Sequence, residues 1–309
     1  MDSQISTSRR GLLKCMAWAG TGIVWTVVGG VPRPLRMSEA IAAPMTTDFT
    51  FVQISDTHIG FNKEANPDPV ATMREAVDHI IKLPKQPSLV LHTGDVSHLS
   101  KPAEFDAAEQ VMKSMNYATR YIPGEHDVIG DDGKEFFARF SKNENTGGWY
   151  SFDQGGVHFV GLVNVLTFDK TQAGSFGDEQ LEFLEKDLQG RSASTPIVVF
   201  THVQMWPIYP QWGWTTADAP QAISYLKRFG SVTVLNGHIH QIVQKVEGNI
   251  SFQTAMSTAF PQPMAGQGPA PAPMKVPTDH LRHVIGIREI TVASNSTKPA
   301  VVADMPLAS

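Results

Sequence analysis

Residues 50–58, TFVQISDTH, run from an alternating apolar and polar stretch directly into an acid and a histidine. The alternation predicts a β-strand over Thr50–Ser55, so Asp56 and His58 stand just past its end. Because open α/β sheets gather functional groups at the carboxyl ends of their strands, we expect similar clusters elsewhere to meet these two residues. Four such clusters each follow an apolar run: Gly94-Asp95, Gly124-Glu125-His126-Asp127, His202 and Gly237-His238-Ile239-His240.

The order of strand and helix signals defines the expected fold. In the first half, short apolar strands alternate with helices that begin near Pro69 and Pro102, and Asp68 before Pro69 is typical of a helix N-terminus. Later the chain turns to hairpins, the first signalled by Gly155-Gly156. We predict an α/β fold, a two-sheet αββα sandwich, forming a single domain over residues 43–309. The expected strands cover residues 50–55, 89–91, 120–122, 149–152, 157–163, 196–200, 232–235, 239–246, 250–253 and 284–292.

The first 42 residues have the character of an export signal. Arg9-Arg10 precedes an uncharged stretch, Met16–Val31, and Ala40-Ile41-Ala42 has the small-x-small pattern that a signal peptidase cleaves. The uncharged stretch is shorter than the roughly 20 residues that span a bilayer, so we predict no stable membrane anchor. Paired arginines are typical of a twin-arginine signal. We therefore predict the twin-arginine export machinery as a partner. We also predict that the mature protein is periplasmic or otherwise exported.

Charge and cysteine content exclude several classes of protein. The chain has 25 basic and 30 acidic residues, and removing residues 1–42 takes away five and two of them, which leaves a net charge of −8. Proteins that bind a nucleic-acid backbone are normally basic, so we expect no such binding. The single cysteine, Cys15, lies within the signal. Any metal site of the mature chain must therefore use histidine, carboxylate or amide ligands.

Taken in order, the five clusters resemble the calcineurin-like metallophosphoesterase superfamily, whose pattern is DxH, GD, GNH(D/E), H and GHxH. The resemblance extends over Phe49–Val292. It implies hydrolysis of a small-molecule phosphoester, a diester or a monoester, by a hydroxide that bridges two metal ions about 3.5–4 Å apart. It implies that His126 lies over the substrate as an acid or as a stabiliser of the transition state, and that Asp127 orients His126. The implied ligands are Asp56, His58, His240 and Asp95 for one ion, and Asp95, residue 125, His202 and His238 for the other.

Residue 125 departs from the family pattern, because Glu125 replaces the usual asparagine. With Glu125, three carboxylates and a hydroxide cancel the charge of two divalent ions, whereas the asparagine site keeps one positive charge. A trivalent ion would restore that charge. We therefore predict Fe(III) together with a divalent partner, which is iron, manganese or zinc.

A second departure is His98, three residues after Asp95. In the purple acid phosphatase branch a tyrosine at that offset binds iron. We predict His98 as a further metal ligand, with a helix-entry residue that does not touch metal as the alternative.

Two questions of function stay open. The aromatic stretch Trp206–Trp214 is interpreted as a wall for an apolar part of the substrate, or as a packed surface loop. The alternative to an enzyme is a non-hydrolytic iron-binding, redox or interaction protein on the same fold. Loss of phosphoester hydrolysis on His126→Ala, with metal retained, would favour the enzyme.

Overall fold

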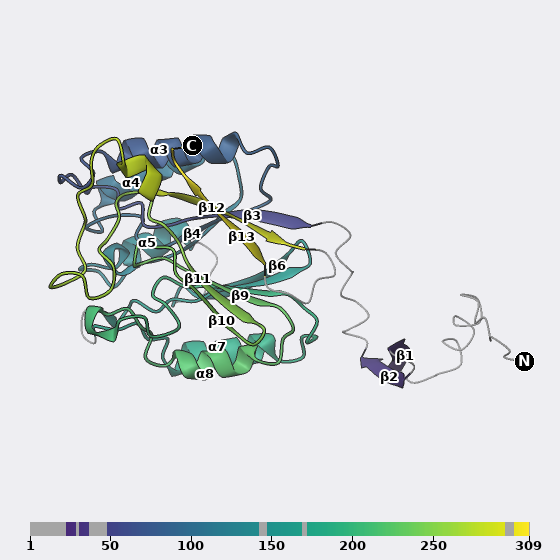
Figure 1. The fold of residues 1–309 in the computed structure, drawn as a ribbon. Helices are drawn as coiled ribbons and strands as arrows, with labels where there is room; N and C mark the ends of the chain where they lie inside the picture. The colour runs from purple at the N-terminus through teal and green to yellow at the C-terminus, as the bar shows by residue number, and fades with distance from the viewer. Residues whose placement is uncertain are drawn as a thin grey trace, which may run out of the picture.

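Two β-sheets stacked face to face form the centre of the molecule (Figure 1). The computed structural model describes residues 48–141, 147–168, 172–293 and 300–308, and the backbone of 23–28 and 31–36. One sheet has five strands, in the order β13 (Val301–Pro306), β12 (Gly286–Val292), β3 (Phe49–Ile54), β4 (Val90–Thr93) and β5 (Thr119–Ile122). The other has six, in the order β10 (Gln244–Glu247), β11 (Ile250–Thr254), β9 (Val232–Asn236), β8 (Ile197–Phe200), β7 (Val157–Gly161) and β6 (Tyr150–Gln154).

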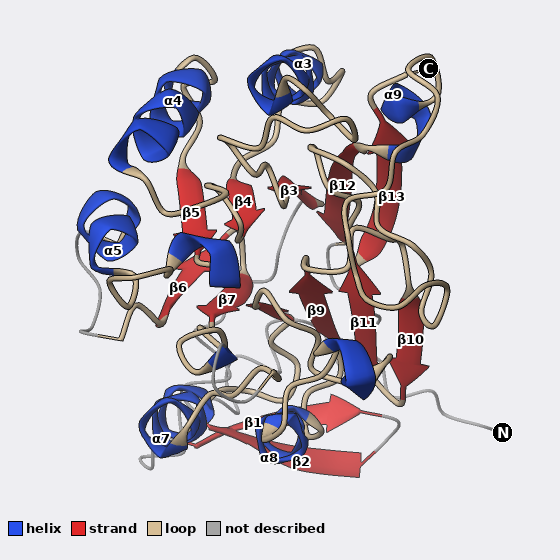
Figure 2. Ribbon diagram, turned by 90° about the vertical axis from the view of Figure 1, so that its left-hand side faces the viewer, coloured by secondary structure: helices blue, strands red, loops and turns tan. Residues whose placement is uncertain are grey.

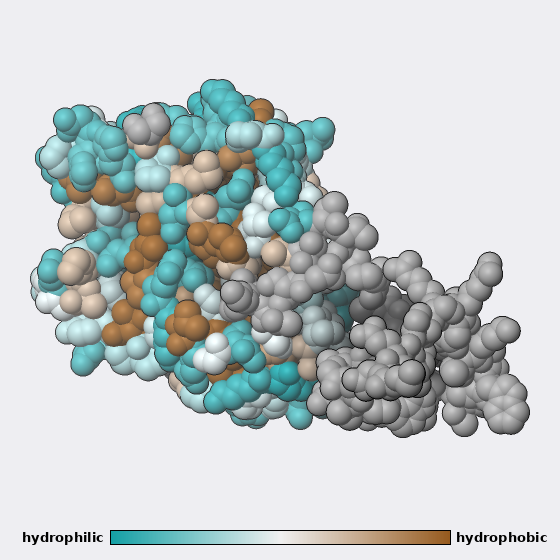
Figure 3. All heavy atoms as spheres, turned by 45° about the vertical axis from the view of Figure 1, so that its right-hand side comes forward, coloured by the Kyte–Doolittle hydropathy of each residue, from teal (hydrophilic) through white to brown (hydrophobic). Residues whose placement is uncertain are grey.

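Helices cover both outer faces, which confirms the predicted αββα sandwich. Figure 1 shows α3 and α4 above the sheets and α7 and α8 below them. The face drawn in Figure 3 is mostly hydrophilic at its top and bottom, with apolar side chains gathered in between. The helices are α3 (Pro69–Ile81), α4 (Pro102–Lys113), α5 (Lys134–Phe140), α7 (Asp178–Leu188), α8 (Ala219–Leu226) and α9 (Leu281–Val284), with short 3-10 turns η1 (Glu125–Asp127) and η2 (Pro210–Trp212).

Apolar side chains from both sheets fill the space between them. Phe51 and Phe159 pack edge to face with their ring centroids 5.2 Å apart, one from each sheet. Phe200 and Leu235 join them and are also fully buried. Burial of one such side chain contributes about 1.5–3 kcal/mol, so this shared layer fixes how the two sheets, and the loops at their ends, sit against each other.

Local sequence signals explain several element boundaries. The carboxylate of Asp68 accepts a hydrogen bond from the Ala71 amide at 3.0 Å, and α3 starts at Pro69 as predicted. Gly155 and Gly156 have φ values of +59° and +78°, which suit the two-residue turn between β6 and β7. The predicted strand over residues 239–246 begins only at Gln244, because His240 adopts a left-handed φ of +54° that a strand does not accommodate.

The predicted export signal lies mainly outside the described residues. Within it, β1 (Ile23–Val28) and β2 (Val31–Arg36) form an antiparallel pair that belongs to neither of the large sheets. Residues 1–22, 29–30 and 37–42 are not described, so the twin-arginine signal stays a prediction. Among the described residues, no helix combines the length and the apolar character needed to cross a membrane.

A partly buried carboxylate, that of Asp187, links α7 to the β6–β7 hairpin. Asp187 accepts hydrogen bonds from Ser151 Oγ and His158 Nε2, both at 2.6 Å. The other ring nitrogen of His158 lies 2.9 Å from Asp153, whose side chain is 63% exposed, against 13% for Asp187. Burial raises the pKa of Asp187, but the hydrogen bonds from His158 and Ser151 lower it further, so the net shift is downward.

We expect Asp187→Asn to destabilise the fold by about 1–3 kcal/mol, because it leaves buried donors poorly paired. Since the folded-state pKa is lowered, this contribution is complete above the ordinary carboxyl pKa of 3.8 and is lost as the pH falls below it. Urea unfolding at pH 7 and at pH 3 measures both effects. Asp153→Asn is the matched control and should change stability by less than about 1 kcal/mol. Equal losses from both variants would contradict the expectation.

Candidate metal centre

The five clusters meet where the parallel strands of both sheets end. Figure 2 looks toward the loops that follow these strands. In one sheet, Asp56 follows β3, Asp95 follows β4 and η1 follows β5. In the other, His202 follows β8 and His238 follows β9. The carboxyl-end rule therefore predicted this meeting point correctly.

The backbone is strained at the site. Nine described non-glycine residues have positive φ, and five of them belong to the clusters: Asp56, His58, Asp95, His238 and His240, with φ between +42° and +70°. Each such residue costs on the order of 1 kcal/mol or more, and it persists only where its surroundings enforce it. Glycines allow the loops to approach one another: a Cβ on Gly124 would overlap Asp95 Oδ1, and one on Gly237 would overlap Ser55 Oγ.

The first group of ligand atoms surrounds Asp56 and His58. Asp56 Oδ1 lies 3.3 Å from His240 Nε2, and His58 Nε2 lies 3.2 Å from the same nitrogen. Asp95 Oδ2 completes the group at 3.4 Å from His58 Nε2. All four side chains are buried.

The second group surrounds Glu125. Its two carboxylate oxygens lie 2.9 Å from His202 Nε2 and 2.8 Å from His238 Nδ1. Asp95 Oδ2 lies 3.5 Å from His202 Nε2, so Asp95 takes part in both groups.

Several buried polar atoms of the second group form no hydrogen bond to described residues outside the group. Glu125 Oε2 and His202 Nε2 face each other, His238 Nδ1 faces Glu125 Oε1, and His238 Nε2 forms no hydrogen bond with any described residue. A buried polar atom that lacks its full set of partners is costly, so these atoms fit the role of metal ligands. On the outward side, His202 Nδ1 donates to the Thr93 carbonyl at 2.7 Å, and His240 Nδ1 donates to the Phe260 carbonyl at 2.6 Å. These bonds occupy Nδ1 of both rings, so Nε2 is the nitrogen that would bind metal once it has lost its proton.

Burial and neighbouring charges shift the pKa values of Glu125, His202 and His58 in different directions. Burial raises the pKa of Glu125, but His238 and His202 lower it more, so the resulting pKa lies well below its ordinary value. Burial lowers the pKa of His202, but Asp95 and Glu125 raise it more, so the resulting pKa lies well above its ordinary value. For His58, burial and the nearby histidines His126 and His240 act together and lower the pKa well below its usual range, which keeps the ring neutral as a metal ligand must be.

His126 stands beside both groups. Its amide donates to Asp95 Oδ1 at 2.9 Å, and its ring Nδ1 donates to the His98 carbonyl at 2.7 Å. Ligand-type atoms of Asp95, Glu125 and His126 all lie within 4.8 Å of one another. His126 is therefore close enough to the candidate ligands to reach a substrate bound there.

Asp127 has a different set of contacts from the one predicted. Its carboxylate accepts from the amides of Val96, Ser97 and Gly124 at 2.7–3.1 Å and from Ser97 Oγ at 2.8 Å. Since Nδ1 of His126 bonds to a backbone carbonyl, orientation of that ring comes from residue 98. Asp127 ties the loop after β4 to the loop after β5.

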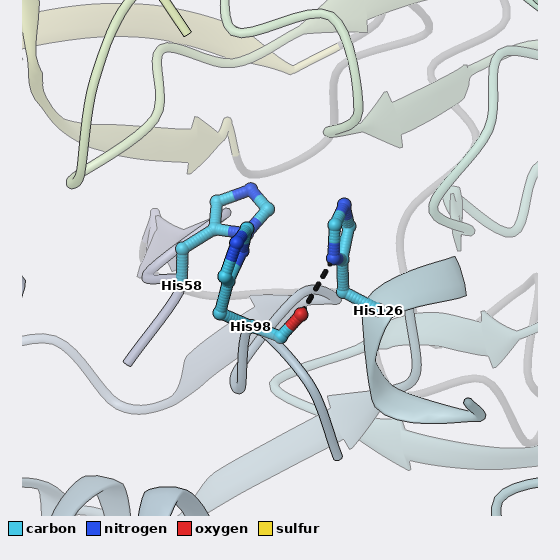
Figure 4. A group of neighbouring side chains, drawn as sticks. All are labelled: His58, His98 and His126. Carbon is cyan, nitrogen blue, oxygen red and sulfur yellow. Dashed lines mark hydrogen bonds between the residues drawn. The ribbon is translucent and has the colours of Figure 1, made fainter. Parts of the chain in front are cut away.

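His98 lies beside His58 (Figure 4), near its Nδ1, whereas Nε2 of His58 faces Asp95. The two Nδ1 atoms are 3.4 Å apart, and the His98 ring stacks on His126 with centroids 4.9 Å apart. Burial lowers the pKa of His98 to about 4, so the ring is neutral.

Sequence reasoning did not find residues 257–260. Phe260 stacks on His58 with centroids 4.8 Å apart and accepts from His240, and Ser257 Oγ donates to the Asp56 carbonyl at 2.7 Å. This segment follows β11, which runs parallel to β9. The same carboxyl-end rule would have pointed to it.

The aromatic stretch Trp206–Trp214 is partly packed into the protein and partly lies next to the site. Trp206 and Trp214 are buried, whereas Tyr209 and Trp212 are partly exposed. Gly213 packs closely against Phe168, whose ring meets His238 edge to face with centroids 5.3 Å apart. The stretch therefore reaches the second ligand group through Phe168.

The fold and the converging clusters define a calcineurin-like phosphoesterase. The sequence model of that family matches residues 49–242, and the chain belongs to the family. It is a hydrolase of phosphate esters, so the non-hydrolytic alternative is not supported.

Individual relatives lie within the same class. A 3',5'-cyclic-nucleotide phosphodiesterase of Nostoc sp. is 22% identical over 220 residues, which cover 68% of this chain and 79% of the relative. A probable glycerophosphodiester phosphodiesterase of Arcobacter nitrofigilis is 26% identical over 157 residues, covering 49% of this chain and 55% of that protein. The structure of a dimetal phosphatase from Danio rerio has a TM-score of 0.58 at 13% identity, over 85% of this chain and 99% of that one, which shows a shared fold.

Proposed function

We propose that this chain hydrolyses phosphodiesters with two metal ions held where the five clusters meet. One observation carries the proposal: Asp95 Oδ2 lies 3.4 Å from His58 Nε2 and 3.5 Å from His202 Nε2. A carboxylate oxygen between two groups of imidazoles is what a bridging ligand requires. The proposed ligands are Asp56, His58, His240 and Asp95 for the first ion, and Asp95, Glu125, His202 and His238 for the second.

The donor set suits such ions. Imidazole and carboxylate ligands without thiolate fit zinc, manganese and iron. When bound, the two ions would activate a water and stabilise charge on the entering and leaving oxygens. With Nδ1 bonded to the His98 carbonyl, His126 keeps Nε2 free to give a proton to the leaving oxygen.

Charge favours a diester over a monoester. With one trivalent and one divalent ion, the carboxylates of Asp56, Asp95 and Glu125 and a hydroxide would leave the site a single positive charge, which matches a diester monoanion. Among the described residues, no lysine or arginine forms a hydrogen bond or ion pair with these three. A monoester dianion needs more compensating charge than a diester monoanion. The names of the Nostoc and Arcobacter relatives, both phosphodiesterases, support the same preference.

We expect faster hydrolysis of bis-p-nitrophenyl phosphate than of p-nitrophenyl phosphate when the metal-free protein is reloaded with manganese, zinc or iron. The measurement is kcat/KM for both substrates with each metal. A faster monoester reaction would overturn the diester preference. No turnover of either substrate with any metal would overturn the proposed function itself.

We further propose that the pair contains Fe(III), because Glu125 adds a negative charge where the family has asparagine. Glu125→Asn is expected to lower the iron content and raise the share of divalent ions, measured by elemental analysis of protein purified from its own host. Glu64→Gln, a change at an exposed acid, is the control. Fully active wild-type protein that contains only divalent ions would contradict the proposal.

A further inference from the structure

His98 lies next to both His58, a proposed ligand of the first ion, and His126, the proposed acid (Figure 4). Its Nδ1 lies 3.4 Å from His58 Nδ1. Its ring stacks on the His126 ring with centroids 4.9 Å apart and an interplanar angle of 15°, and its carbonyl accepts a hydrogen bond from His126 Nδ1 at an N···O distance of 2.7 Å. One residue thus touches a proposed ligand of the first ion and the proposed acid.

We propose that His98 is a positioning residue and not a metal ligand. It determines which ring nitrogen carries the proton in His58 and in His126. The inference rests on the proposed function. It replaces the sequence-based prediction that His98 binds metal.

The two nitrogens of His58 face different surroundings. Nε2 points to the first ligand group, 3.4 Å from Asp95 Oδ2 and 3.2 Å from His240 Nε2. A metal ion bound there takes the Nε2 lone pair, so the proton of the neutral ring must sit on Nδ1. That N–H needs an acceptor, and metal-binding histidines usually find one in a second residue. His98 Nδ1 is the partner that the structure offers.

The same geometry argues against His98 as a ligand of the first ion. Ligand atoms of Asp56, His58 and His240 cluster within 4.8 Å, but among the described residues His98 clusters only with His58 and His126. In that cluster, Nδ1 of His126 is already bonded to the His98 carbonyl. A metal ion among these three rings would therefore have to take Nε2 of His126, the nitrogen that the proposed function reserves for the proton of the leaving group.

His98 is itself held firmly. Its amide donates to the Ile59 carbonyl at 2.9 Å and to Glu104 Oε2 at 3.2 Å, and Glu104 also accepts from the Leu99 amide at 2.7 Å. The Phe61 ring meets the His98 ring edge to face with centroids 5.2 Å apart. Because Glu104 lies in the first turn of α4, the helix fixes His98, and His98 in turn fixes His58 and His126.

Two substitutions separate the functions of this side chain. His98→Phe keeps a ring that can stack on His126 but removes the acceptor for His58. His98→Asn removes the ring and places an amide oxygen near the position of Nδ1. Both variants keep the carbonyl that binds His126.

The test compares the wild type with both variants after loading with zinc. Nitrogen NMR of histidine-labelled protein reports which ring nitrogens carry protons or metal, and competition with a chromogenic chelator reports affinity. We expect a His58 proton on Nδ1 and no metal on His98 in the wild type. His98→Phe should weaken binding at the first site by about 10–100-fold, and His98→Asn should restore most of it. Thermal unfolding of the metal-free proteins separates these effects from a loss of folding.

Three results would overturn the inference: a metal-bound nitrogen of His98, a third bound ion, or unchanged affinity and protonation in His98→Phe. All three presuppose a wild-type protein that binds two ions and hydrolyses a diester. Failure of the proposed function would appear earlier, as a wild-type protein that does neither.

Discussion

Asp95→Ala is expected to release both metal ions and to lower kcat/KM more than any other single substitution at the site. Asp95 Oδ2 is the atom common to both ligand groups, and Oδ1 accepts from the His126 amide at 2.9 Å. Loss of a supporting residue outside the ligand set already costs about 10–100-fold in metal affinity or activity. Removal of the shared ligand should exceed that range. Equilibrium dialysis followed by elemental analysis, together with diester kinetics, measures both effects.

Two further variants test the cause of that loss. Asp95→Asn keeps the shape and an acceptor for the His126 amide, so its metal loss would be due to the missing charge. Asp78→Asn, at an exposed position on α3, should behave as the wild type. If Asp95→Ala retained two ions, the bridging assignment would be wrong.

His126→Ala is expected to slow hydrolysis by about 10²–10⁴-fold for a diester with an alkoxide leaving group, while both ions stay bound. An alkoxide is a poor leaving group that needs a proton, whereas p-nitrophenolate leaves without one. The effect on bis-p-nitrophenyl phosphate should therefore be much smaller. The measurement is kcat for the two substrates at saturating metal.

The difference between leaving groups is the decisive result. Equal losses for both substrates would mean that His126 does not act as an acid, and loss of metal would mean that it is a ligand. His283→Ala, at an exposed position outside the site, is the control for removal of a histidine.

The main features of the fold and the meeting of the five clusters could be predicted from sequence for one reason. Short apolar runs such as Leu89-Val90-Leu91 are buried strands, and parallel strands bring the residues after their carboxyl ends to one edge of the sheet. Asp56 and Asp95 are 39 positions apart in sequence but lie after adjacent strands. Their proximity therefore follows from the strands that they terminate and requires no knowledge of side-chain contacts.

Other features depend on contacts that sequence periodicity does not carry. Helix α8 has only eight residues, and strand β13 has no fully buried side chain and no regular alternation of burial, so neither produces a strong pattern. Ser100 is a residue type that commonly opens a helix, but its hydroxyl donates to the His126 carbonyl at 2.8 Å, and Glu104 bonds to the amides at the start of α4 instead. The contacts of Asp127 and His98 likewise depend on which loops the sheets bring together.

The left-handed residues at the site have a consequence for the timing of metal capture. Hydrogen bonds within the protein hold this backbone: the Asp56 amide donates to the Gly94 carbonyl at 3.0 Å, and the His58 amide donates to the Asp95 carbonyl at 2.9 Å. The conformational entropy of arranging the ligands is therefore lost during folding, not during capture. An ion that arrives meets a preorganised cage, and it stabilises the folded chain according to its concentration relative to its dissociation constant. The metal-free chain should consequently be the less heat-resistant form of the protein.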